Sequence, residues 1–204
     1  MTNTELFIKN IESFGLSLWD LGFLEGAPDK QMNEVESVIK RPLPDDFRLF
    51  LKNINGQLSD NFYFLPDQAL LFSCDEIVAE YKDQMHFFAD TSEFYNIYQF
   101  NDKIRCTVWS ESRVPIAGRD DYYLFLDFDP GPNGTEGQVI FLINECEFVV
   151  LAPDFSGFIA LYNNLIMNRT LQIRKITNGQ DVNYRLTTDV DFLNGQDFAR
   201  LFGQ

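Results

Sequence analysis

The chain contains 204 residues, of which 45% are hydrophobic and 23% are charged, and this balance excludes a wholly disordered protein. Its 31 acidic and 16 basic residues give a formal net charge of −15 at pH 7. Such an acidic excess argues against a broad nucleic-acid-binding surface and against docking on an anionic membrane, because both carry negative charge. Residues 61–154 alone hold 17 of the acids and five of the bases, which favours a basic protein as partner.

The first half of the chain has the periodicity of helices. Thr4 is a candidate N-cap for a short first helix. In residues 29–40 apolar side chains recur every three or four positions, which predicts an amphipathic helix. Pro44 suits the start of a further helix, which Asn55-Gly56 would end. The segment 73–76 (Ser-Cys-Asp-Glu) has the spacing of a capping box and predicts another helix after it.

The second half of the chain predicts strands. They are expected at residues 103–109, 122–128, 137–143 and 147–152. Asp154 or Ser156 would cap a helix after the last of these. Asn178-Gly179 then marks the turn of a β-hairpin.

This order of elements predicts an α+β fold, with a mostly antiparallel central sheet and helices packed against it. We expect residues 1–170 to form one domain and residues 171–204 to extend it as a hairpin with a tail.

Cysteine content and hydropathy indicate the compartment. Cys74, Cys106 and Cys146 are few, odd in number and far apart, which argues against a disulfide framework. The longest apolar runs are five residues, too short to span a bilayer. The first ten residues lack the basic and apolar regions of a secretory signal. We therefore expect a cytoplasmic protein with reduced thiols and no membrane partner.

Few motifs in the sequence point to catalysis. The single histidine, His86, lies at the end of a predicted helix, where the helix dipole stabilises a cation. This position indicates a structural histidine rather than a catalytic one. Neither a zinc-binding pattern nor a glycine-rich phosphate loop occurs, so we expect no metal and no cofactor. Asp127, Asp129 and Glu136 leave a carboxylate-dependent hydrolase as an alternative. The Pro, Gly and Asn residues between them equally indicate a rigid turn, and a calcium loop fails because Gln138 stands where a bidentate Glu is required.

Two stretches of the sequence resemble the SUKH superfamily, which includes fungal cell-wall assembly regulators and bacterial toxin-immunity proteins. In residues 33–57, Leu43-Pro44 precedes a predicted helix and Asn55-Gly56 follows it. The second stretch contains a Trp, then YLFLDFDPGPNGTEGQVIFL, then VLAPDFSGFI. The residues to which the resemblance gives a structural role are Pro44, Gly56, Trp109, Asp127, Asp129, Pro130, Gly131, Gly134, Gly137 and Gln138. Ala117-Gly118 departs from the glycine pair usual at that point, and residues 171–204 lie outside the pattern.

The resemblance implies a non-enzymatic protein-binding domain. For bacterial members it implies an immunity protein that occludes a toxin, commonly a nuclease or deaminase. The acidic middle of the chain fits this independently, because a nuclease carries a basic cleft. The acids expected to contact such a partner are Asp75, Glu76, Glu80, Asp83, Asp120 and Asp121. A regulatory scaffold of the cell-wall assembly type is the alternative, and a hydrolase is the least favoured.

Overall fold

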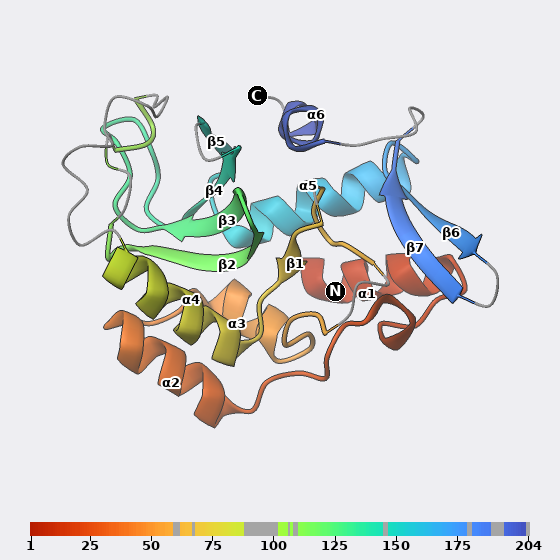
Figure 1. Ribbon diagram of the computed structural model, residues 1–204, viewed down its shortest axis with the longest axis horizontal. Coiled ribbons are helices and arrows are strands. Elements are labelled where there is room, and N and C mark those ends of the chain that lie inside the picture. Colours follow the sequence, from red (N-terminus) through yellow and green to blue (C-terminus); the bar gives the residue numbers. More distant parts are fainter. Residues whose placement is uncertain are drawn as a thin grey trace.

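The computed structural model describes residues 1–58, 62–66, 68–87, 102–105, 107, 110–144, 147–178, 181–188 and 194–202. In these residues a five-stranded antiparallel sheet packs with helices, and a separate two-stranded hairpin projects at one end (Figure 1). This confirms the predicted α+β class.

The elements follow in chain order. The strands of the large sheet, hydrogen-bonded in this order, are β1 Leu70–Leu71, β2 Arg113–Arg119, β3 Tyr122–Asp127, β4 Gln138–Ile143 and β5 Glu147–Ala152. The hairpin consists of β6 Gln172–Asn178 and β7 Asp181–Thr187. The helices are α1 Asn3–Ser13, α2 Asp29–Ile39, α3 Asp45–Leu51, α4 Cys74–Phe87, α5 Phe155–Met167 and α6 Gly195–Leu201, with a 3-10 turn, η1, at Trp19–Leu21.

The first helix is capped by Thr2, so the prediction of Thr4 as its N-cap is wrong. Thr2 Oγ1 accepts a hydrogen bond from the Glu5 backbone N–H at 3.1 Å, and the Glu5 carboxylate accepts one from the Thr2 N–H at 2.8 Å. Thr4 is buried instead. The reciprocal cap needs an acid three positions after the Thr, which Thr2 has in Glu5 and Thr4 lacks.

Two later helices follow their sequence signals, whereas α3 ends at Leu51 and not at the predicted Asn55-Gly56. In α2 the buried side chains are Met32, Val35 and Ile39, one apolar stripe. Before α4, the Ser73 N–H and Oγ both donate to the Glu76 carboxylate, at 2.7 and 2.8 Å. The predicted capping box is therefore present.

The large sheet is buried on both faces, and alternate residues enter two apolar clusters. Val114, Leu126 and Phe141 belong to the main core with the helices, whereas Phe125 and Ile140 belong to a second cluster. All residues of β4 are consequently buried. Burial on both faces explains why this strand reads as a continuous apolar run rather than an alternating one.

The strand predicted at 103–109 does not form in the described part of that segment, where Ile104 makes only an isolated bridge to Pro130. The position next to β3 is taken by β2, which the sequence did not predict. Pro115 and Gly118 interrupt the strand pattern of β2, and its register with β3 shifts after Pro115. Pairing to β1 and β3 overrides this weak local propensity.

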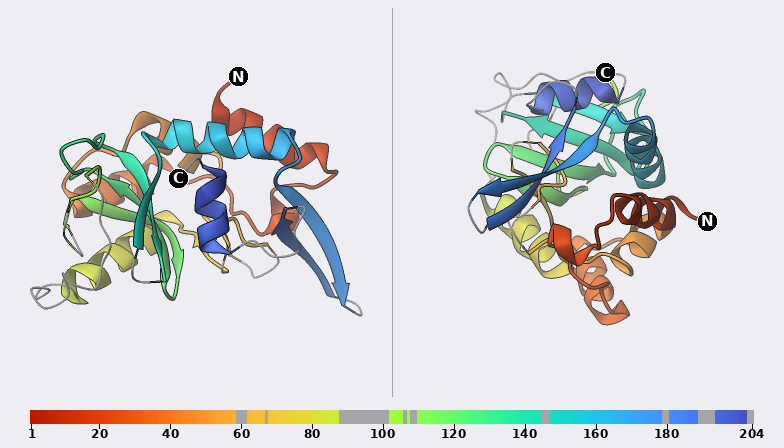
Figure 2. Two further views of the ribbon diagram at one scale, coloured as in Figure 1. Left: turned by 90° about the horizontal axis from the view of Figure 1, so that it is seen from above. Right: turned by 90° about the vertical axis from the view of Figure 1, so that its right-hand side faces the viewer.

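The C-terminal region pairs as predicted and packs on the main core. The strands β6 and β7 pair from Gln172 with Thr187 to Asn178 with Asp181, which confirms the hairpin. Leu171 and Phe198 belong to the main core, and α6 was not expected. Figure 2 shows α5 lying beside α1, with the hairpin projecting past the end of both.

Among the described helices, none combines the length and the apolar character that crossing a bilayer requires.

Candidate functional site

The loop of residues 128–137 joins β3 to β4 and contains five of the ten motif residues. The strand residues at its two ends, Asp127 and Gln138, are register partners. The Asp127 carbonyl accepts a hydrogen bond from the Gly137 N–H at 2.8 Å, and Gly137 has a φ of +80°. A residue with a side chain rarely adopts that left-handed conformation, so the glycine allows the loop to close.

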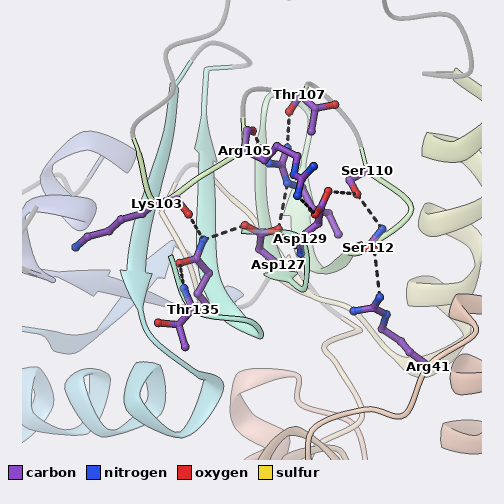
Figure 3. Close-up of polar contacts among 11 residues, drawn as sticks. Arg41, Lys103, Arg105, Thr107, Ser110, Ser112, Asp127, Asp129 and Thr135 are labelled. Atoms are coloured by element: carbon purple, nitrogen blue, oxygen red, sulfur yellow. Dashed lines mark hydrogen bonds and ion pairs between the residues drawn. The ribbon is translucent and has the colours of Figure 1, made fainter. Parts of the chain in front are cut away.

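Asp127 lies at the centre of a buried polar network (Figure 3). Its Oδ1 accepts from the Asp129 backbone N–H at 3.2 Å and from Arg113 Nε at 3.4 Å, and its Oδ2 accepts from Gln138 Nε2 at 2.9 Å. Neither carboxylate nor guanidinium is exposed to solvent. A buried charge must be compensated by hydrogen bonds or an opposite charge, and the hydrogen bonds that compensate Asp127 also connect the two ends of the loop.

Arg113 extends the same network to the segment before β2. Its Nη1 donates to the Thr107 carbonyl at 2.5 Å, its Nη2 donates to the Arg105 carbonyl at 2.9 Å, and its guanidinium lies 5.1 Å from the centroid of the Phe148 ring. Burial lowers the pKa of Arg113, while Asp127 and Asp129 oppose that shift. An arginine nevertheless stays protonated in proteins. Sequence analysis missed this residue, although a buried aspartate in a strand is a signal that a counter-charge lies nearby.

Two glycines let the loop lie directly on the segment containing Asp102 and Lys103. The Gly131 N–H donates to the Lys103 carbonyl at 2.9 Å. A Cβ at Gly131 would lie 2.5 Å from the Asp102 carbonyl oxygen, and one at Gly134 would lie 2.1 Å from that of Lys103. Side chains at either position would force the two segments apart.

Asp129 lies on the outer side of the network. Its Oδ1 is 2.8 Å from Arg105 Nη2, and its Oδ2 accepts from Ser110 Oγ at 3.3 Å. Nearby, Arg41 donates to Ser112 Oγ at 3.1 Å and lies over the Phe128 ring at 4.5 Å from its centroid. The bond from Ser110 to Asp129 joins the loop to the residues just before β2. The contacts of Arg41 with Ser112 and Phe128 join the loop to the segment that follows α2.

The three carboxylates of the hydrolase alternative have different surroundings. Asp127 is buried and fully hydrogen-bonded, Asp129 is paired with Arg105, and Glu136 is exposed. Within the described part of the chain, no three His, Cys, Asp or Glu side chains gather closely enough to hold a metal ion. The geometry of the described residues therefore offers no convergent acid–base pair.

The remaining motif residues lie at turns. Pro44 is the N-cap residue of α3. Gly56 has a φ of +86°, and a Cβ there would lie 2.3 Å from the backbone nitrogen of Ser73. Trp109 lies outside the described residues. The structural role assigned to the motif set stays a prediction, which substitution of Asp127 tests below.

The acids predicted to contact a partner lie on α4 and on the turn between β2 and β3. We term them the acidic surface: Asp75, Glu76, Glu80, Asp83, Asp120 and Asp121. All are exposed except Glu80, which is half-buried. Figure 1 shows that α4 lies on the outside of the molecule, along the sheet edge formed by β1 and β2.

A hydrogen bond joins the two parts of the acidic surface. Tyr123 donates its hydroxyl to the Glu80 carboxylate at 3.3 Å, and burial raises the pKa of Glu80 while this bond opposes the shift. Gly118 makes room for the ring, since a Cβ there would lie 2.5 Å from Tyr123 Cδ1. The bond therefore joins the start of β3, just after Asp120 and Asp121, to α4.

The acids differ in how freely they can meet a partner. Glu76 caps α4 through Ser73, and Asp120 lies 3.9 Å from Arg119. Asp75, Asp83 and Asp121 make no ion pair with any of the described residues. These three carboxylates are the most open to a cationic partner.

The chain was compared with known protein families. A family model described as the SMI1 / KNR4 family (SUKH-1) matches residues 26–161. A search of curated proteins finds no match. The matched stretch runs from before α2 into α5 and contains both the motif loop and the acidic surface, whereas residues 1–25 and 162–204 lie outside it. Because the match covers about two thirds of the sequence and agrees with the motif loop, the chain belongs to the SMI1/KNR4 (SUKH-1) family.

Proposed function

We propose that this chain is a non-enzymatic protein-binding module, an immunity protein that neutralises a basic toxin domain of the nuclease or deaminase class by covering it. The observation that carries the proposal is the acidic surface, which has six carboxylates, five of them exposed, on α4 and the β2–β3 turn of a SUKH-1 domain. Opposite charges across an interface speed encounter and fix orientation, and a nuclease must present a basic cleft to its substrate.

The rigidity of α4 supports this role. Its apolar side is anchored by buried Ile77 and Tyr81, and the Tyr81 hydroxyl donates to the Glu111 carbonyl at 2.7 Å. A preformed helix face loses little conformational freedom on binding, so more of the interaction energy appears as affinity.

The state of the motif carboxylates supports a role without chemistry. Asp127 and Asp129 are engaged by Arg113, Gln138 and Arg105, which leaves neither carboxylate free to act as a general base. We place the action of the protein in the cytoplasm, where the buried thiol of Cys74 would remain reduced.

The test starts with a pull-down from the native source, and the partner obtained is used in association kinetics. Reversing two open acids, as Asp75→Lys/Asp83→Lys, should slow association by about tenfold or more and flatten its dependence on salt. The matched control is Glu12→Lys/Glu25→Lys, which makes the same change in net charge at exposed positions away from the acidic surface.

Two results would contradict the proposal. One is a partner that is not a toxin domain. The other is an equal loss of association rate in both double variants, since a general charge effect requires no specific surface.

A further inference from the structure

A second distinctive surface lies at the other end of the long axis from α4 (Figures 1 and 2). It combines the ends of α1 and α5, the turn η1 and the hairpin β6–β7, all outside the stretch that matches the family. We term it the terminal surface: Phe14, Trp19, Met167, Arg169, Arg174, Ile176 and Arg185.

A groove of about 490 Å³ opens between the C-terminal ends of α1 and α5. Phe14 and Met167 line it and are 39% and 52% exposed, and Arg169 lines it as well. Asn10 also lines the groove and is fixed, because its side-chain amide donates to the buried Asn163 Oδ1 at 2.9 Å. The groove therefore combines apolar and polar side chains, and the cation Arg169 is among them.

Trp19 begins the turn η1 and is 74% exposed. The Ser17 N–H and hydroxyl donate to the Asp20 carboxylate at 2.7 and 2.6 Å, which fixes η1. The pKa of Asp20 is lowered chiefly by these bonds and to a smaller extent by the nearby Lys175 of β6. Exposed tryptophans on rigid supports are the commonest anchors of protein interfaces.

The hairpin is basic, in contrast to the rest of the molecule. Residues 162–188 contain four bases and one acid, in a chain of net charge −15. Arg174 and Arg185 are direct cross-strand partners, so their exposed side chains share one face of the hairpin. Ile176 lies two residues further along that face and is 37% exposed.

A simpler role for these bases would be to keep the edges of the hairpin soluble, as lysines often do. Charge alone would serve that purpose. The exposed Trp19, Met167 and Ile176 instead reduce solubility, and the combination of aromatic, Met and Arg side chains is the composition enriched at interface cores.

We propose that the terminal surface docks against the acidic surface of a second copy of this chain, head to tail. The two surfaces have opposite charge, and they face away from each other at the two ends of the molecule. Since they differ, the contact is heterologous and repeats from copy to copy. At physiological salt the Debye length is about 8 Å, so the repulsion between two acidic molecules is screened while contacting charges still attract.

The test measures the mass of the purified full chain by sedimentation velocity over about a hundredfold range of concentration. The average mass should rise above the 23.7 kDa of one chain at physiological salt and return to it at high salt. Arg169→Glu/Arg185→Glu should weaken association by about tenfold or more. The control Lys9→Glu/Lys30→Glu has the same net charge and should not differ from the parent by more than the general charge effect.

A charge exchange tests the pairing of the two surfaces directly. Arg169→Glu/Arg185→Glu and Asp75→Lys/Asp83→Lys should each associate poorly alone. They should recover association when mixed, because each keeps the native surface that the other has lost. In the parent background, Trp19→Ala should weaken association several-fold without lowering the melting temperature, because Trp19 is largely exposed.

A mass that stays at one chain under all conditions would overturn the proposal. So would an equal loss in the Arg169→Glu/Arg185→Glu variant and its control. These readouts need no toxin, so this inference and the proposed function can fail separately, although both use the acidic surface.

Discussion

At the scale of single residues, the ion pair of Arg113 and Asp127 is the feature with the largest energetic consequence. Both side chains are fully buried, and removing two charges from water is costly. The structure offsets that cost with hydrogen bonds on both sides, from Gln138 to the carboxylate and from the guanidinium to the carbonyls of Arg105 and Thr107. Removing one partner leaves the other charge buried and uncompensated.

Asp127→Ala should therefore lower the free energy of unfolding by about 3–5 kcal/mol, measured by urea denaturation. Asp129→Ala is the matched control and should cost about 1 kcal/mol or less, because its partner Arg105 is 60% exposed. Equal losses in the two variants would contradict this account of the loop. The double variant Arg113→Met/Asp127→Leu should be more stable than Asp127→Ala, since it leaves no charge unpaired.

At the scale of elements, the C-terminal region is joined to the main core through aromatic side chains. Phe198 of α6 is fully buried, and its ring centroid lies 6.0 Å from that of Phe141 in β4 and 4.9 Å from that of Phe202. Leu171, at the start of the hairpin, is fully buried as well. These contacts support the prediction that residues 171–204 extend the domain formed by residues 1–170.

Phe198→Ala tests that prediction. It should cost about 3–5 kcal/mol, the range for removing a buried aromatic ring, in a single cooperative transition. Phe14→Ala is the comparison and should cost less, since Phe14 is partly exposed. A separate early transition for the C-terminal region, or a negligible loss, would mean that it folds apart from the rest.

At the scale of the whole molecule, the net charge of −15 acts against the compact state. The repulsion is greatest where acids outnumber bases, as on α4, which carries four acids (Asp75, Glu76, Glu80 and Asp83) and one lysine, Lys82. Few of the described ion pairs relieve it, because most are partly exposed and contribute little each.

Added salt should therefore stabilise the fold. Raising sodium chloride from low to physiological concentration should raise the melting temperature by a few degrees in calorimetry, because screening weakens the repulsion between exposed carboxylates more than it weakens the buried Arg113–Asp127 pair. A melting temperature that falls with salt would show that attractive surface pairs outweigh the repulsion.

Much of the fold was predictable because its signals are local in the chain. The capping box at Ser73, the apolar stripe of α2, the N-cap Asp154 of α5 and the hairpin turn after Asn178 each involve neighbours in sequence. The same holds for the motif loop, whose glycines and prolines identified the family. Thr4 was predicted as the N-cap of α1, but Thr2 caps the helix because Glu5 follows Thr2 at the spacing of a capping box.

The parts that were missed depend on long-range contacts. Strand β2 has weak strand propensity and exists because β1 and β3 pair with it. Arg113 carries no local signal, since its partner Asp127 follows it by 14 residues and meets it only across the sheet. The candidate acids were named from charge alone, whereas the bond between Tyr123 of β3 and Glu80 of α4 is a long-range contact that only the structure shows.

The sequence by itself determined the class of fold, the family and the acidic character of this protein, because periodicity, turn chemistry and charge are properties of adjacent residues. Only the tertiary structure decided that the motif carboxylates are buried or paired, and that the ends of α1 and α5 meet the hairpin in one basic and apolar surface. Burial and juxtaposition arise from packing between segments that are more than a hundred residues apart, as in the hydrogen bond from Asn10 to Asn163, and no local pattern encodes them.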